Sequence, residues 1–184
     1  MLAMHVMNEC LMDKAFFSSS RYQHPITDHV PAMPKVYYNV DTAIQSFFST
    51  SQTSATRAQC DQLASKIGRP VEPVQLQGMN SYTVQAGSHK IIQFREAATL
   101  LDMDMLTLAK HIYGDVVAQC TYHGWVGTSQ ETGLAVYEMD LLPGENYILA
   151  RSLLAETPDL HLNTVRSLAR FVDRPGFINA WRRS

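Results

Sequence analysis

Apolar side chains recur at helical intervals in two short stretches between residues 41 and 67. In the first stretch Asp41 is suited to cap a helix, and in the second either Ser54 or Thr56 is. Gly68 and then Pro70 follow the second stretch, an order typical of a helix end. The apolar positions are Ala43, Ile44, Phe47 and Phe48 in the first stretch and Cys60, Leu63, Ala64 and Ile67 in the second. The pattern predicts two helices over 41–70 and, before them, a loose arm over 1–40.

After residue 73 the pattern becomes typical of strands. Runs at 74–77, 81–85 and 90–95 are separated by short segments that contain Gly78 and Gly87. The last two runs are predicted to form an antiparallel hairpin. A helical interval follows over 101–112, with Asp102 and Asp104 in its first turn, where the helix dipole favours acidic side chains.

Two further strand-like runs occupy 116–122 and 133–139, and the turn at Pro143 and Gly144 precedes two helical stretches at 146–154 and 162–172. The element order is therefore two helices, three strands, a helix, two strands and two helices. This order predicts an α+β fold in which a five-stranded antiparallel sheet carries one inserted helix and is flanked by N-terminal and C-terminal helices.

Composition narrows the function classes. Charged residues make up 17% of the chain, against a usual value of about 25%, and the net charge of −2 leaves no basic stripe for a nucleic acid. The three cysteines lie far apart, which argues against a disulfide framework or a structural zinc site and favours a reducing, cytoplasmic location. No run approaches the roughly 18 apolar residues that a membrane span requires.

Four segments carry a resemblance to a known family. They are QGMNSYTV at 77–84, IIQFR at 91–95, LAKHIYG at 108–114 and VYEMDLLPG at 136–144. In order and spacing they resemble the aminoglycoside phosphotransferase and choline-kinase-like family, which has a protein-kinase-like fold, and especially its fungal branch. The resemblance implies that 71–144 form the N-lobe and hinge, and that 145–184 form the start of a truncated C-lobe.

The resemblance also implies a site for ATP, bound weakly. The loop residues Gly78, Asn80 and Ser81 would lie over the nucleotide phosphates, and Arg95 on the third strand would pair with them. The hinge would bind the adenine edge through its backbone, and apolar side chains would line the base. The residues implied in these last two roles are Val84, Ile92, Glu138, Met139 and Asp140.

Each of these residues has a simpler interpretation. A loop with one glycine is also an ordinary hairpin turn, and Arg95 also fits the solvated end of an edge strand. Val and Ile on a strand are more commonly plain core. A carboxylate that would orient Arg95 is not obvious, because Asp102 and Asp104 fit a helix start and Glu96 faces the other way.

The catalytic half of the family's mechanism is not found. Phosphoryl transfer needs an Asp loop and metal-binding groups, and nothing after Asp140 matches the His-Gly-Asp-x-x-x-x-Asn loop of the family. Cys120 and His123 are three apart on a strand and so face opposite ways, which argues against a shared metal.

These observations predict no catalytic residue and no Mg²⁺ site in this chain. We expect an inactive kinase-like protein of small-molecule, specialised-metabolite chemistry, or a fragment whose remainder supplies the Asp loop. The alternative is a non-catalytic binding or regulatory module. Such a module would use the low-charge surface of the lobe to contact a partner protein or a second copy of itself.

Overall fold

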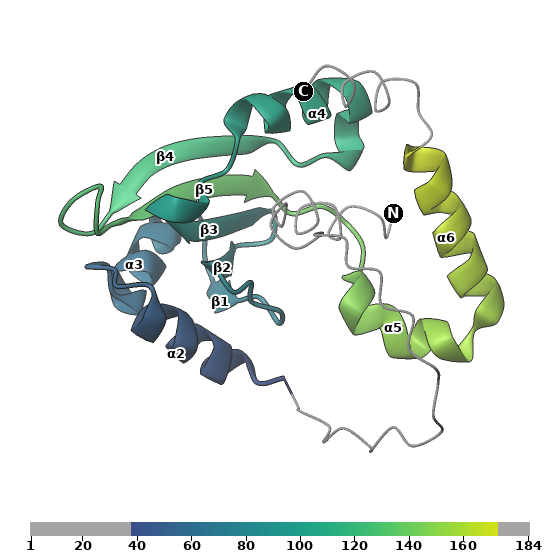
Figure 1. Ribbon diagram of the computed structural model, residues 1–184, viewed down its shortest axis with the longest axis horizontal. Coiled ribbons are helices and arrows are strands. Elements are labelled where there is room, and N and C mark those ends of the chain that lie inside the picture. The colour runs from purple at the N-terminus through teal and green to yellow at the C-terminus, as the bar shows by residue number, and fades with distance from the viewer. Residues whose placement is uncertain (1–37, 173–184) are drawn as a thin grey trace, which may run out of the picture.

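A computed structural model describes residues 38–172 as an open antiparallel sheet with helices around it (Figure 1). The fold is α+β, as predicted. The helices are α2 (Val40–Thr50), α3 (Arg57–Ile67), α4 (Met103–Tyr113), α5 (Tyr147–Glu156) and α6 (Pro158–Val172), with short 3-10 helices η1 (Ala97–Thr99) and η2 (Gly114–Val116). The strands are β1 (Val71–Pro73), β2 (Ser81–Ala86), β3 (Lys90–Glu96), β4 (Cys120–Val126) and β5 (Leu134–Asp140). The arm predicted for 1–40 lies outside the described residues except for its last three, and α2 already begins at Val40.

The sheet has the strand order β1-β2-β3-β5-β4, and every neighbouring pair is antiparallel. The predicted hairpin is confirmed: β2 and β3 pair from Ser81 opposite Arg95 to Ala86 opposite Lys90. β5 then lies along the other side of β3, where Ala135 is opposite Arg95. Since opposite residues share a face, this register fixes which side chains meet.

One face of the sheet is the main core. Alternate residues of the central strands, including Tyr82, Val84, Ile92 and Phe94, are fully buried on this face against side chains of α2 and α3. Helix α4 packs near β4 and β5, where Leu101 clusters with side chains of the opposite face. Helices α2 and α3 thus cover one face of the sheet, and α4 lies on the other.

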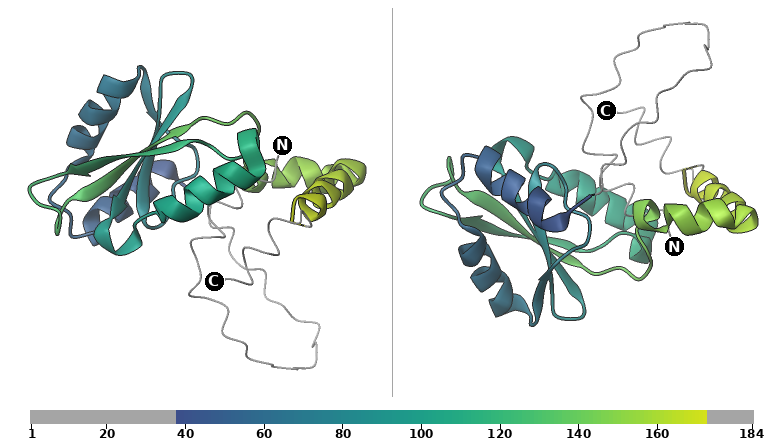
Figure 2. Two further views of the ribbon diagram at one scale, coloured as in Figure 1. Left: turned by 90° about the horizontal axis from the view of Figure 1, so that it is seen from above. Right: turned by 90° about the horizontal axis from the view of Figure 1, so that it is seen from below.

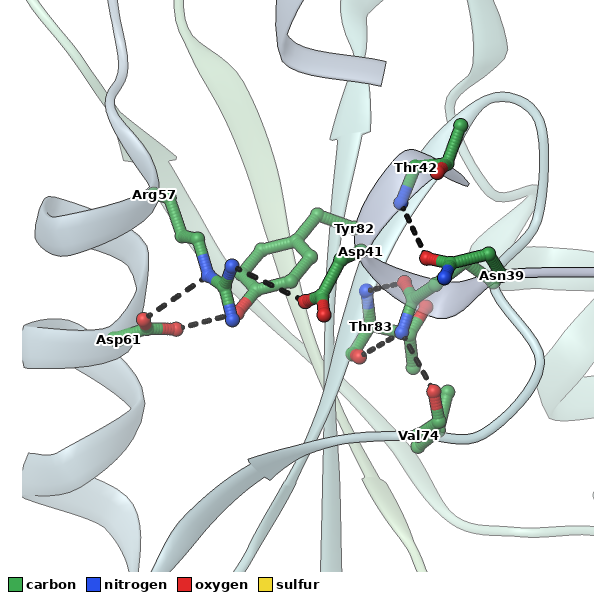
Figure 3. A network of polar contacts seen from close by, with 9 residues as sticks. Asn39, Asp41, Thr42, Arg57, Asp61, Val74, Tyr82 and Thr83 are labelled. Carbon is green, nitrogen blue, oxygen red and sulfur yellow. Dashed lines mark hydrogen bonds and ion pairs between the residues drawn. The ribbon is translucent and has the colours of Figure 1, made fainter. Parts of the chain in front are cut away.

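Polar contacts fasten α2 and α3 to β2 (Figure 3). The Tyr82 hydroxyl donates to Asp61 Oδ1 over 2.6 Å, and the Arg57 guanidinium lies within 3.7 Å of Asp61 and 4.0 Å of Asp41. Asp41 is not the cap of α2. Asn39 is, because its Oδ1 accepts from the Thr42 N–H.

Thr56 caps α3 in a reciprocal pair of hydrogen bonds with Gln59. Of the two predicted caps, Ser54 and Thr56, the second is therefore confirmed. Gly68 does end this helix, but it is extended, with φ −164°. A Cβ at Gly68 would lie 2.6 Å from the Ala86 carbonyl oxygen, so close packing against β2 requires the glycine.

Three boundary predictions were wrong. The first strand is Val71–Pro73 rather than 74–77, because the Gln77 side chain occupies the edge of β2 beyond Pro73. The fourth strand begins at Cys120 rather than at 116, since η2 intervenes. The last helix begins at Pro158 rather than at 162, and proline is well tolerated in the first helical turn because that turn does not need its N–H.

Helices α5 and α6 lie beyond one end of the sheet and project away from it (Figure 2). Each exposes several large apolar side chains: Ile148, Leu149 and Leu153 on α5, and Leu160, Leu162 and Val165 on α6. Among the described residues, no helix has both the length and the apolar character needed to cross a bilayer.

Candidate functional site

Arg95 is buried near the end of β3. Only 7% of the residue is exposed, and its Nε donates to the Thr99 carbonyl over 2.6 Å. Since β3 lies between β2 and β5, the interpretation of Arg95 as the solvated end of an edge strand is wrong. A buried guanidinium is costly unless it is hydrogen-bonded, and the Thr99 carbonyl supplies one acceptor for Arg95.

The loop between β1 and β2 lies close to Arg95. Thr99, whose carbonyl accepts from Arg95, donates its hydroxyl to the Asn80 carbonyl over 3.5 Å. Ser81 is directly opposite Arg95 in the hairpin and is 2% exposed. The structure therefore brings Asn80, Ser81 and Arg95 together, with Gly78 in the same loop.

Val84 and Ile92 lie on the other face. Both are fully buried in the core under α2 and α3. They alternate with Thr83 and Gln93, which share the face of Arg95, so neither can line the same surface as Arg95. For these two residues the plain-core interpretation fits the geometry.

The residues that were expected to form a hinge, at the end of β5, divide in the same way. Met139 shares the face of Arg95, whereas the Glu138 and Asp140 side chains point to the α2–α3 side. The backbone N–H of Asp140 donates to the Gln119 carbonyl and that of Leu141 to the His89 carbonyl. Those two backbone donors are thus occupied within the chain.

A network of ion pairs joins β3, β4 and β5 at the end of the sheet where β5 stops. Lys90 Nζ is 2.7 Å from Glu138 Oε1 and 3.0 Å from Asp140 Oδ1, and His123 Nε2 is 2.8 Å from Glu138 Oε2. The hydrogen bond from Lys90, with a smaller contribution from His123, lowers the pKa of Glu138 although partial burial opposes it. The same hydrogen bonds to Glu138 and Asp140 raise the pKa of Lys90. The sequence did not predict this network of ion pairs, because only the strand register brings these residues together.

A set of polar side chains also lies on the face of Arg95, and we call it the polar ladder: Ser81, Thr83, Gln93 and Arg95. Gln93 Nε2 donates to Ser81 Oγ over 3.2 Å and to Thr83 Oγ1 over 3.4 Å. The sequence signal was the alternation of Ser81 and Thr83 with apolar neighbours, which indicates a polar face. Gln93 and Thr83 were not among the predicted site residues.

Neither metal nor thiol chemistry is favoured in the part of the chain that the structure describes. Residues 38–172 contain no group of three His, Cys, Asp or Glu side chains placed to hold a metal ion. Burial raises the pKa of the Cys60 thiol to about 12 and that of Cys120 to about 11. Both thiols are therefore protonated at neutral pH and are weak nucleophiles.

Comparison with known proteins gives no match among family models, curated proteins or solved structures.

Proposed function

We propose that this chain is an aminoglycoside-phosphotransferase-like lobe that binds the phosphates of a nucleotide at Arg95 without catalysing phosphoryl transfer by itself. The observation that carries the proposal is the buried Arg95, linked through Thr99 to the β1–β2 loop at Asn80. A buried cation beside a loop backbone is suited to anionic oxygens.

The placement of the other elements supports this function. The order of three strands, a helix and two strands is the order that the family resemblance implies. The loop and Arg95 lie at one end of β3, and the hinge lies at the other, where Lys90 is opposite Asp140. The span from Ala135 to Asp140 is about 17 Å along the strand, so the two ends of one nucleotide could reach the proposed hinge and phosphate contacts.

No turnover is expected. Between 141 and 172 the acidic residues are Glu145, Glu156 and Asp159, and the last two flank the junction of α5 and α6. None follows the His-Gly-Asp pattern that orients the nucleophile. The chain is thus proposed to lack both the catalytic Asp and the Mg²⁺ ligands.

The test is a titration of the full chain with ATP, followed by amide NMR and calorimetry. We expect shifts around Gly78, Arg95 and Glu138, and loss of binding in Arg95→Met. Arg151→Met, a change of an exposed arginine on α5, serves as the matched control. Unchanged amide positions at saturating ATP would exclude the proposal, and ATP consumption that Arg95→Met abolishes would refute the absence of catalysis.

A second candidate is a non-catalytic module that contacts a partner protein or a second copy. It is favoured by the six large apolar side chains exposed on α5 and α6, because soluble proteins seldom expose such clusters without a contact to make. The two candidates are compatible, since the apolar side chains lie beyond the end of the sheet.

A further inference from the structure

The Gln93 amide is incompletely hydrogen-bonded. Its Nε2 has two acceptors, Ser81 Oγ and Thr83 Oγ1, whereas its Oε1 is shielded from solvent and has no hydrogen-bond partner. A buried acceptor without a donor costs about 1–3 kcal/mol. Such a group calls for an explanation, because buried polar atoms in folded proteins are nearly always satisfied.

Turning the amide over does not remove the deficit. Oε1 would then accept from the hydroxyls of Ser81 or Thr83, and Nε2 would take the unpartnered place. One end of the amide therefore lacks a partner in either orientation. In the observed orientation Nε2 donates to both hydroxyl oxygens, so the unpartnered atom is the acceptor Oε1.

Gln93 stands in the middle of the polar ladder. It is opposite Thr83 on β2 and opposite Tyr137 on β5, and it shares their face. Arg95 is two residues further along the same strand, about 7 Å away. The unpartnered atom thus lies between the hinge and the proposed phosphate site, on the side where a nucleotide would extend.

We propose that Gln93 recognises the nucleotide by accepting, at Oε1, a hydrogen bond from an O–H or N–H group of the ligand. The proposal rests on the proposed function, because the ligand is placed by its phosphates at Arg95. The donor is either a ribose hydroxyl or the exocyclic amine of adenine, which share this chemistry. Recognition through a β3 side chain also fits the hinge, where the N–H groups of Asp140 and Leu141 are already occupied.

Because Oε1 is shielded, the ligand must displace part of what covers it. We therefore expect ATP to move the side-chain NH₂ resonances of Gln93 and the backbone amides of Thr83 and Tyr137. A buried water that satisfied Oε1 would instead leave these signals unchanged on titration.

The decisive comparison is the affinity of Gln93→Leu for ATP against that of Gln85→Leu. Gln85 lies on the same face, but its Nε2 already donates to the Gly87 carbonyl over 3.0 Å. We expect Gln93→Leu to weaken ATP binding about tenfold or more, the effect of leaving a ligand donor unpaired, and Gln85→Leu to leave it unchanged. Gln93→Met, close in length to the native side chain, replaces Gln93→Leu if the latter fails to fold by circular dichroism.

Three analogues identify the donor. Loss of affinity for inosine triphosphate in the wild type, with no further loss in Gln93→Leu, assigns the exocyclic amine. The same pattern with 2′-deoxy- or 3′-deoxy-ATP assigns a ribose hydroxyl, because coupled changes are not additive.

The outcomes separate the two proposals. If ATP binds and Gln93→Leu has the same affinity for ATP as Gln85→Leu, the role of Gln93 is overturned and the proposed function stands.

If the wild type binds no ATP, the proposed function fails. Adenosine, which carries both donors without phosphate, then tests Gln93 alone. Adenosine binding lost in Gln93→Leu then supports the recognition role, and no adenosine binding overturns it as well.

Discussion

The side chain of Gln77 pairs with the backbone of Thr83 as a strand residue would. Gln77 Oε1 accepts from the Thr83 N–H over 2.9 Å, and Gln77 Nε2 donates to the Thr83 carbonyl over 2.8 Å. The Val74 N–H also donates to the Thr83 carbonyl, over 3.2 Å, so the Gln77 amide adds a second donor there and supplies the acceptor for the Thr83 N–H.

Gln77→Met is expected to lower the free energy of unfolding by about 1–3 kcal/mol, because the buried Thr83 N–H loses its acceptor. Urea denaturation followed by circular dichroism measures the change. Gln85→Met removes a single side-chain hydrogen bond and should cost no more than about 1 kcal/mol. Equal losses in the two variants would show that Gln77 is not an essential part of the sheet edge.

The contact of Tyr82 with Asp61 is expected to couple α3 to the sheet (Figure 3). Hydrogen bonds to charged groups contribute about 1.5–3 kcal/mol, so Tyr82→Phe should destabilise the chain by that order. A double-mutant cycle with Asp61→Asn isolates the pair. Tyr147→Phe is the control, since its hydroxyl has only a long, exposed contact with His161 at 3.4 Å. A coupling energy near zero would contradict the assignment.

Because of Glu138, we expect the free energy of unfolding to fall at acid pH. Its pKa is lowered in the folded chain, mainly by the hydrogen bond from Lys90, so it stabilises the fold above its ordinary value of 4.5. That contribution is lost as the pH falls below 4.5 and through the folded pKa. The stability difference between wild type and Glu138→Gln should therefore be larger at pH 7 than at pH 3.

Denaturant midpoints of both proteins across this range provide the measurement. Glu131→Gln, an exposed change in the loop before β5, is the matched control and should show a smaller dependence on pH. A difference for Glu138→Gln that is constant from pH 7 to pH 3 would be inconsistent with a lowered pKa.

The exposed apolar residues of α5 and α6 predict association. We expect the sedimentation coefficient of the full chain to rise with concentration, and Leu153→Asp to reduce that rise, because Leu153 is 58% exposed. Ser167→Asp, on the exposed surface of α6, controls for added charge. A chain that stays monomeric at high concentration argues against self-association as the second candidate function.

Much of the fold could be predicted because its signals are local. Alternation located β2, β3 and β5, and the helical spacing located α2 and α3. What failed was the replacement of a strand by one side chain, Gln77, which no hydrophobic pattern encodes. The start of β4 was predicted too early because Val116 and Val117 have high strand propensity, whereas the chain forms η2 up to Val116.

The candidate site could be predicted only in part. The third-strand position of Arg95 followed from the order of the segments, but Val84 was assigned to the same site although the pairing of Ser81 with Arg95 puts it on the other face. That pairing depends on how the turn at Gly87 aligns two strands, which composition does not reveal. The contact of Lys90 with Glu138 is likewise a consequence of register across β3 and β5.

The alternation along β3 allows its two faces to change independently. Ile92 and Phe94 pack against α2 and α3, whereas Gln93 and Arg95 lie on the opposite face of the sheet. Substitutions at the odd-numbered positions therefore leave the packing of β3 against α2 and α3 in place. Inserting or deleting one residue would exchange the two sets and move the guanidinium into the apolar core under α2 and α3, so this strand tolerates changes of identity far better than changes of length.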